Sequence, residues 1–260
     1  MVRLDICRKR SGVPVLSRKE IDDIGEKLVQ DFCPAAMIHP QALDVDLFAQ
    51  DYLGMEQDYQ YLSHCGVYLG MTVFNDTNKV VVFNPEKNEA EYIKARAKTI
   101  IIDNTLLEEK QEHRYRFTMG HEAAGHGVLH EPYFGYDRNQ LTLFGAANEP
   151  AMIQCRTDSS KIVTKDQKFW DDRDWMEWQA NAMASSFLMP KAMVLMVAEE
   201  AKKKVKNNRG NIVAYRMAEA VSEIFNVSTE AALYRLKALG LVGPDVKHQS
   251  GIYDFLDLLA

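Results

Sequence analysis

His121 and His126 stand five residues apart within a predicted buried helix at 112–130. On a regular α-helix, positions five apart point roughly 140° away from each other, whereas positions four apart differ by roughly 40°. A single π-type turn would absorb the additional residue and return both rings to one side. The intervening residues are small, and Gly125 adds backbone freedom. The sequence therefore permits a widened turn that presents His121 and His126 together.

The residue types at this turn are typical of a zinc-dependent hydrolase. Two imidazoles on one side of a helix can bind one metal ion, and a glutamate beside the first histidine can deprotonate the attacking water. Glu122 occupies that position in the segment His121-Glu122-Ala123-Ala124-Gly125-His126. In this interpretation His121 and His126 bind the metal and Glu122 is the general base.

Two other interpretations of the histidines remain open from the residues alone. His126 and His130 are four apart, and Glu122 precedes His126 by four, so these three could line one face of a straight helix and bind metal without a widened turn. Alternatively, the histidines are core residues of a helix, each with an ordinary hydrogen-bond partner. A clustered carboxylate favours the metal interpretations over this last one.

A zinc site of this kind needs a third protein ligand, with the fourth position left for water. The predicted helix at 172–188 offers Glu177, which lies among the three tryptophans of the chain, Trp170, Trp175 and Trp178. A carboxylate in an apolar setting requires a partner, and a metal is one. A surface lysine or arginine would serve equally well, so the residues alone leave the role of Glu177 open.

Helices dominate the predicted secondary structure, and the few strands cluster. Ser17 and Glu20 form a capping-box pair ahead of an apolar stripe, which predicts the first helix. Helices are expected at 17–32, 42–53, 112–130, 172–188, 191–208, 211–225 and 229–239. Strands are expected at 67–74, 79–83 and 99–102, the first two forming a hairpin around a turn at 75–78, and 131–170 is expected to be mostly loop. The fold class is therefore α+β.

We expect three parts along the chain. Residues 1–16 are basic and lack a pattern, which predicts a loose N-terminal arm. Residues 17–208 would form the main domain, and a polar, glycine-containing stretch near 207–210 would separate it from a C-terminal helical extension at 209–260.

Composition narrows the class of protein. Apolar residues make up 47% of the 260 residues, which is enough for a sizeable core. The net charge of −6 argues against nucleic acid as the main ligand. The four cysteines form no CxxC pair, which argues against a zinc ribbon or a disulfide scaffold. The N-terminus lacks a signal-like apolar run and no apolar stretch is long enough to span a membrane, so we expect a cytoplasmic protein without membrane contact.

Three blocks of sequence resemble the ImmA/IrrE family of cytoplasmic zinc metallopeptidases. Arg116-Phe117-Thr118-Met119-Gly120-His121-Glu122, followed by Gly125-His126 and Leu129-His130, resembles its RFTxAHELGHxxLH signature. Glu177, Ala180-Asn181, Ala184 and Leu188-Met189-Pro190 resemble its ExxANxFAxxLLMP segment. Phe225 to Ser228, with Ala232-Leu233 and Tyr234 to Leu241, resembles its FxVSxxAxxxRLxxLG tail. The three blocks occur in the family's order over residues 116–241.

The resemblance implies a mostly helical, zincin-like metallopeptidase domain with a small β-sheet and a helix-turn-helix-like extension. It implies Zn²⁺ held by His121, His126 and Glu177, with Glu122 as general base. His130 and Asn181 also match family positions, and we expect them to support the ligands. The departure from the family is the additional residue between His121 and His126, which gives HExxxH in place of HExxH.

The resemblance also implies a substrate, because studied family members cleave helix-turn-helix repressors and so relieve repression in mobile-element or stress circuits. The protein would then be an antirepressor protease whose partner is a repressor protein rather than DNA. The substrate would enter in an extended form, as a strand added beside the hairpin at 67–83.

Two rival functions belong to other classes. A catalytically inactive relative would keep the fold and sequester its repressor. A DNA-binding module would use the helical pair at 211–241 with the basic run Lys202-Lys203-Lys204, Lys206 and Arg209. A packed helical pair behind a solvated basic helix end explains the same residues, and we favour it.

Overall fold

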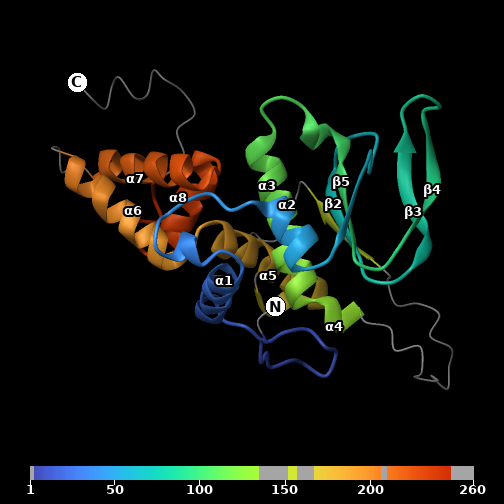
Figure 1. Cartoon of the computed structure of the whole chain (residues 1–260), viewed down its shortest axis with the longest axis horizontal. Coiled ribbons are helices and arrows are strands. Elements are labelled where there is room, and N and C mark those ends of the chain that lie inside the picture. The colour runs from blue at the N-terminus through green and yellow to red at the C-terminus, as the bar shows by residue number, and fades with distance from the viewer. Residues whose placement is uncertain (1–2, 135–151, 157–166, 206–209, 247–260) are drawn as a thin grey trace.

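The computed structural model describes residues 3–134, 152–156, 167–205 and 210–246. Helices gather at one end of the molecule and β-strands at the other, and a long helical segment runs between them (Figure 1). The structure is α+β and mostly helical with a small mixed sheet, as the sequence predicts.

The helical half is built around α1 (Arg18–Phe32) and α5 (Asp172–Leu188), which pack against each other. Ser17 and Glu20 form the expected capping box at the start of α1. A Cβ atom at Gly25 of α1 would lie 2.5 Å from Oγ of Ser186, so the two helices approach closely at a residue without a side chain. The short helical segments Pro34–Met37 and Val45–Leu47 (α2), with a π turn at Phe48–Tyr52, follow α1.

Three C-terminal helices complete this half: α6 (Lys191–Lys204), α7 (Gly210–Phe225) and α8 (Thr229–Ala238). They contribute to the same apolar cluster as α1 and α5. Arg235 of α8 is fully buried, and it donates to Oδ1 of Asp22 at 2.6 Å and to the carbonyl of Met189 at 3.0 Å. Residues 206–209 and 247–260 lie outside the described residues, so the division near 207–210 remains a prediction.

The main sheet has the strand order β1-β5-β2-β6. Its strands are β1 (Glu56–Gln60), β2 (Tyr68–Val73), β5 (Thr99–Asp103) and β6 (Met152–Arg156). β1 runs parallel to β5, whereas β2 is antiparallel to both β5 and β6. The sheet therefore places β2 between two neighbours, facing the helix that carries the histidines.

The predicted hairpin between 67–74 and 79–83 is wrong. β3 (Thr77–Asn84) pairs instead with β4 (Glu89–Ala95) in a separate two-stranded sheet. The Asn84 side chain accepts from the backbone N–H groups of Glu86 and Lys87, and Asn88 adopts a positive φ of 55°, so residues 85–88 form the turn. β2 is almost entirely buried and takes partners on both edges, which leaves no edge for a substrate strand beside it.

The sequence missed β1, β4 and β6. β1 (EQDYQ) is mostly polar, and charged residues interrupt the apolar residues of β4 (EAEYIKA). Neither strand has a buried residue, so both lack the continuous apolar run that indicates a strand. β6 falls within the expected loop at 131–170, together with α4 (Glu131–Phe134) and a 3-10 turn at Gln167–Phe169. Residues 135–151 and 157–166 lie outside the described residues.

The expected loose arm is wrong for residues 3–16. Val13 is fully buried, and Arg8 and Pro14 form an isolated β-bridge. The Arg8 guanidinium donates to the carbonyl of Leu129 at 2.9 Å. Apolar side chains within the segment and a long-range hydrogen bond to the helix after the histidines therefore hold this part of the chain in place.

The remaining helices match their predicted positions within a few residues, except that the helix at 112–130 divides. α3 (Glu112–Gly120) continues into a π-helical segment, η4 (His121–Gly127). Within the described ranges, no single helix has both the length and the apolar character to cross a membrane. The consecutive helices α5 and α6, which meet at a bend of 58°, meet both criteria only when they are taken as a pair.

Candidate metal centre

The π-helical segment η4 contains both histidines of the HExxxH motif. The widened turn predicted from the five-residue spacing is present. The rings of His121 and His126 lie with their centroids 4.7 Å apart and their planes at 75°. The additional residue is therefore absorbed locally, and the two imidazoles occupy the same side of the helix.

Close packing between η4 and α5 brings Glu177 to the side of η4 on which the two histidines lie. A Cβ atom at Gly125 would lie 2.7 Å from Cα and 2.8 Å from Cβ of Ala180. Such distances are shorter than any real carbon contact, so only glycine allows the two backbones to approach this closely. Ala180 follows Glu177 by about one helical turn, and the approach therefore places Glu177 beside the histidines.

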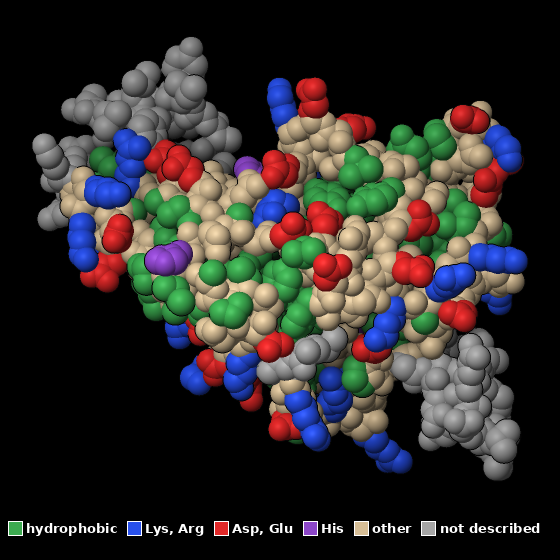
Figure 2. Space-filling model, in the orientation of Figure 1, with side chains coloured by type: hydrophobic (Ala, Val, Ile, Leu, Met, Phe, Trp, Pro, Cys, Tyr) green, Lys and Arg blue, Asp and Glu red, His purple; other side chains and the backbone are tan. Residues whose placement is uncertain are grey.

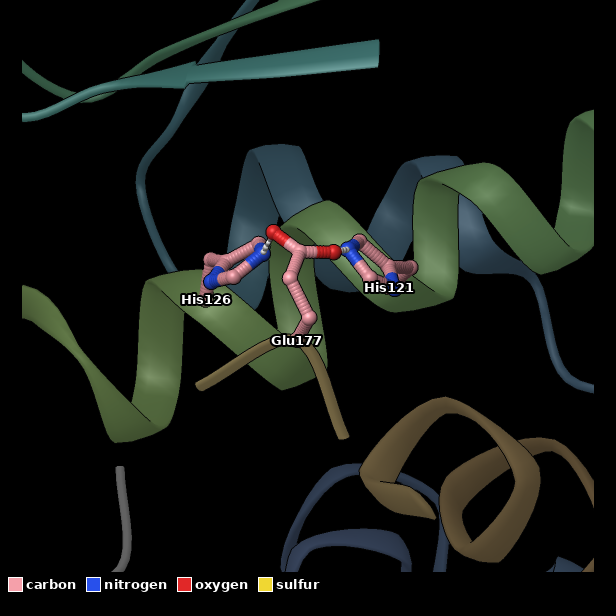
Figure 3. A group of neighbouring side chains, drawn as sticks. All are labelled: His121, His126 and Glu177. Atoms are coloured by element: carbon pink, nitrogen blue, oxygen red, sulfur yellow. Dashed lines mark ion pairs between the residues drawn. The ribbon is translucent and has the colours of Figure 1, made fainter. Parts of the chain in front are cut away.

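Glu177 lies between the two histidine rings (Figure 3). Its Oε2 is 3.5 Å from Nε2 of His121, and its Oε1 is 3.5 Å from Nε2 of His126. One ligand atom from each of the three residues lies within 4.8 Å of the others, so the group could hold a metal ion. No surface lysine or arginine of the described chain takes the place of the histidines as ion-pair partner of Glu177.

The donor atoms of this group fit a divalent cation. Within the described chain, Nε2 of His121 and Nε2 of His126 are buried and have no hydrogen-bond partner. Buried polar atoms are normally satisfied, so two orphaned nitrogens facing one carboxylate indicate that something else binds there. Two imidazoles and a carboxylate are the ligands that Zn²⁺ takes in catalytic sites.

The electrostatic environment keeps both rings neutral, which is the form that binds metal. Burial, helped by the neighbouring His126, lowers the pKa of His121 to about 4. Burial lowers the pKa of His126 to about 3. Burial also raises the pKa of the Glu177 carboxyl, because its charged form loses hydration. A cation between these groups would replace that lost hydration.

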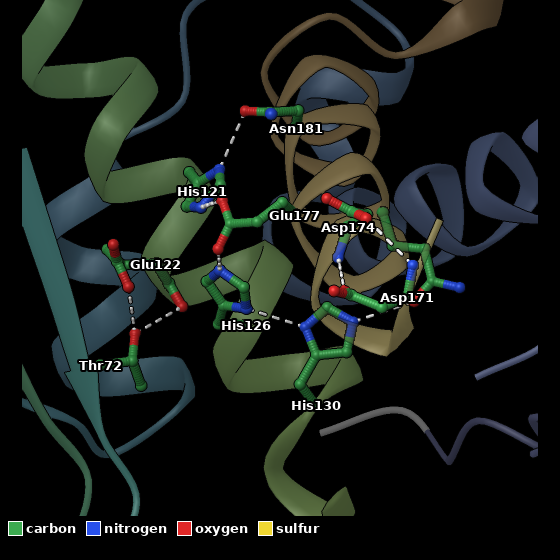
Figure 4. A network of polar contacts seen from close by, with 10 residues as sticks. Thr72, His121, Glu122, His126, His130, Asp171, Asp174, Glu177 and Asn181 are labelled. Atoms are coloured by element: carbon green, nitrogen blue, oxygen red, sulfur yellow. Dashed lines mark hydrogen bonds and ion pairs between the residues drawn. The ribbon is translucent and has the colours of Figure 1, made fainter. Parts of the chain in front are cut away.

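Asn181 and His130, the two residues expected to support the ligands, contact the two ligand histidines directly (Figure 4). Oδ1 of Asn181 lies 3.0 Å from Nδ1 of His121, so the amide oxygen accepts a hydrogen bond from the Nδ1–H group and Nε2 of the neutral ring carries no proton. Nδ1 of His130 lies 2.9 Å from Nδ1 of His126. The straight-helix alternative is not assembled, because His130 uses its Nδ1 on His126 and Glu122 points elsewhere.

Glu122 points toward the sheet rather than toward His130. Its Oε2 accepts from the Thr72 hydroxyl of β2 at 2.5 Å. A Cβ atom at Gly70, also in β2, would lie 2.8 Å from Oε1 of Glu122, so the absence of a side chain there makes room for the carboxylate. Thr72 and Gly70 thus fix the position of Glu122 next to His121.

Sequence reasoning missed Thr72, Gly70 and a third residue, Gln179, whose Oε1 lies 3.0 Å from Nε2 of His130. Thr72 and Gly70 stand some fifty positions before Glu122 and belong to no local motif, so only the tertiary pairing reveals them. The tryptophans near Glu177 contact one another edge-on.

Comparison with known families supports the resemblance seen in the sequence. A peptidase family model described as "IrrE N-terminal-like domain" matches residues 135–237. This range covers α5 with Glu177 and Asn181 and begins after η4, so the two histidines lie before it. A search of curated proteins finds no match. The matched segment is thus similar to a metallopeptidase-like family, in agreement with the ImmA/IrrE resemblance of the sequence.

Proposed function

We propose that this protein is a zinc-dependent endopeptidase that cleaves a helix-turn-helix transcriptional repressor and so relieves repression in a mobile-element or stress circuit. The observation that carries the enzymatic part is the pair of buried, partnerless Nε2 atoms that face Glu177. The substrate part rests on the family resemblance.

Each residue of the centre has a defined task in this proposal. His121, His126 and Glu177 hold the ion, and Asn181 and His130 orient the two imidazoles. Bound Zn²⁺ would polarise the peptide carbonyl and lower the pKa of a water molecule to about 7. Glu122 takes the proton from the water and delivers it to the leaving amine. Thr72 holds one oxygen of Glu122 and so fixes the orientation of the carboxylate.

Metal analysis tests the ligand assignment. We expect about one equivalent of zinc in protein purified without chelator, and its loss in His121→Ala and Glu177→Ala. His130→Ala is the comparison variant. It leaves all three ligands in place and removes only the support of His126, so we expect zinc to bind more weakly but not to be lost. Retention of zinc in His121→Ala together with its loss in His130→Ala would overturn the assignment.

Glu122→Gln tests proteolysis separately from metal binding. The amide keeps the size of the side chain and removes the base, so we expect zinc content to be unchanged and new N-termini in helix-turn-helix proteins to disappear from cells that express the variant. Derepression that survives Glu122→Gln would exclude cleavage as the mechanism.

A second candidate function is a non-catalytic regulator that binds the repressor without cutting it. The additional residue of the HExxxH motif favours this candidate, because it departs from the spacing of the active family pattern. The same Glu122→Gln experiment separates the two, since sequestration does not need a base.

DNA binding is less well supported. Arg235, a cation of α8, is buried in its ion pair with Asp22 and so cannot reach phosphate. On the face shown in Figure 2, acidic and basic side chains are interspersed over the described surface. A gel shift with strong salt dependence would favour DNA binding over both proposals above.

A further inference from the structure

A chain of hydrogen bonds leads from the N-terminal segment to the metal centre. The Gln179 amide nitrogen donates to the carbonyl of Pro14 at 2.7 Å. A carbonyl oxygen can only accept a hydrogen bond, so the nitrogen of the Gln179 amide must face Pro14. The amide oxygen of Gln179 must then face His130, whose Nε2 lies 3.0 Å away. All the side chains involved are buried, and Gln179 is only 1% exposed.

The direction of each bond then follows from the one before. An amide oxygen accepts, so Nε2 of His130 carries the proton. A fully buried ring favours the neutral form, in which a proton on Nε2 leaves Nδ1 bare. Nδ1 of His130 therefore accepts from Nδ1 of His126, 2.9 Å away. His126 carries its proton on Nδ1, and its Nε2 lone pair faces Glu177.

We propose that Gln179 is a positioning residue for the metal centre, because its amide, held by the Pro14 carbonyl, fixes His126 in the tautomer whose bare Nε2 faces Glu177. This inference deepens the proposed function and rests on it for the importance of Nε2. A rotated Gln179 amide would present N–H groups to His130, reverse both imidazoles and place a proton where the ion must bind.

The two ligand histidines are thus oriented in different ways. Among the described residues, Asn181 of α5 is the side chain that accepts a hydrogen bond from His121. His126 depends on three further groups, the last of which belongs to the segment of residues 3–16. Arg8 of that segment also donates to the carbonyl of Leu129, next to His130, and so holds the same region from a second point. The N-terminal segment is therefore part of the metal centre although it supplies no ligand.

Nuclear magnetic resonance of the metal-free protein tests the inference without metal or activity. In protein with ¹⁵N-labelled histidine, the ring nitrogens should report His130 protonated on Nε2 and His126 protonated on Nδ1. The reverse assignment in the unmodified protein would refute the chain of bonds directly, whatever the variants do.

Gln179→Met keeps the length of the side chain and removes both polar groups. We expect His126 to become a mixture of tautomers and zinc affinity, measured by chelator competition, to fall about 10- to 100-fold. Gln179→Asn is the second variant, since an amide shorter by one methylene cannot reach Pro14 and His130 together, and it should shift both readouts in the same direction. If Gln179→Met does not fold, the tautomer and the zinc affinity of Gln179→Asn test the inference instead.

Ser186→Ala is the matched control. It removes another buried hydrogen bond of α5, to Asp22, at a distance from the histidines. It should lower the melting temperature and leave both tautomer and zinc affinity unchanged. Unchanged tautomer and affinity in the Gln179 variants would refute the inference while zinc binding by the unmodified protein stands. Absence of zinc binding in the unmodified protein would instead refute the proposed function.

Discussion

The close approach of η4 and α5 at Gly125 predicts a large effect from one methyl group. In Gly125→Ala the new Cβ would lie 2.7 Å from Cα and 3.0 Å from the carbonyl oxygen of Ala180. Carbon atoms in contact are about 3.5–4.0 Å apart, so the two helices must separate by about 1 Å. The obstacle is backbone, which cannot rotate away as a flexible side chain would.

This separation should affect both stability and metal binding. Overpacking of this kind costs about 1–3 kcal/mol, which corresponds to roughly 2–4 °C in melting temperature per kcal/mol for a chain of this size. Glu177 stands one turn from Ala180, so it moves away from His121 and His126. We expect zinc affinity to fall at least about tenfold, as for the loss of a supporting contact.

Gly120→Ala is the matched control for this prediction. Gly120 precedes Gly125 by five residues and faces the same helix, but a Cβ atom there would lie 3.5 Å from Leu188 and 3.7 Å from Ala184, which is ordinary contact. An alanine in place of a helical glycine gains about 0.5–1 kcal/mol. Gly120→Ala should therefore be neutral or stabilising in urea unfolding, with unchanged zinc affinity. Equal behaviour of the two variants would refute the packing argument.

Three further predictions follow from the same geometry. Gly70→Ala places a Cβ atom 2.8 Å from Oε1 of Glu122, so turnover should fall by about 10²-fold with zinc content unchanged, and a normal turnover in peptide hydrolysis would contradict the placement of the base. Deletion of Ala124 should convert the π turn into a regular helix without changing the phase of either flank, so the variant should fold and bind zinc; loss of zinc by a folded variant would show that the register had shifted. The pKa of His126 is lowered to about 3, below the ordinary value of 6.5 for the unfolded chain, so the unfolded state takes up the proton first and the metal-free protein should lose stability as pH falls from about 6.5. Urea unfolding should show a shallower decline in His126→Gln than in the unmodified protein, and equal slopes would refute the burial of a neutral ring.

The helices were predictable because their signals are local. The capping box of Ser17 and Glu20 and the apolar stripe behind it identify α1 without knowledge of the rest of the chain. Strand pairing was not predictable in the same way. β2 and β3 are consecutive and both rich in β-formers, yet β2 is buried between β5 and β6, and β3 turns back on β4. Which strand pairs with which depends on contacts that no short window of sequence contains.

In the candidate site, too, the residues of local motifs were predictable and those that act through tertiary contacts were not. His121, Glu122 and His126 stand in one local motif, and the resemblance to a family supplied Glu177. Gln179 and Thr72 act only through residues distant in sequence, and neither has a residue type that indicates a metal centre on its own. The ordered N-terminal segment was not predictable for a related reason. A short basic segment without periodicity does not indicate that Arg8 will donate a hydrogen bond to the carbonyl of Leu129, more than a hundred residues away.

The additional residue between the histidines need not weaken the centre. In a π turn the backbone hydrogen bond closes five residues along, so residues five apart take the relative position that residues four apart have in an α-helix. The cost is a wider helical turn that must be supported from outside. Gly125 allows α5 to press against that turn, and β2 holds Glu122 on the opposite side. The two elements that support the widened turn, α5 and β2, are also the elements that carry Glu177 and hold Glu122, so the turn and the candidate metal centre depend on the same packing.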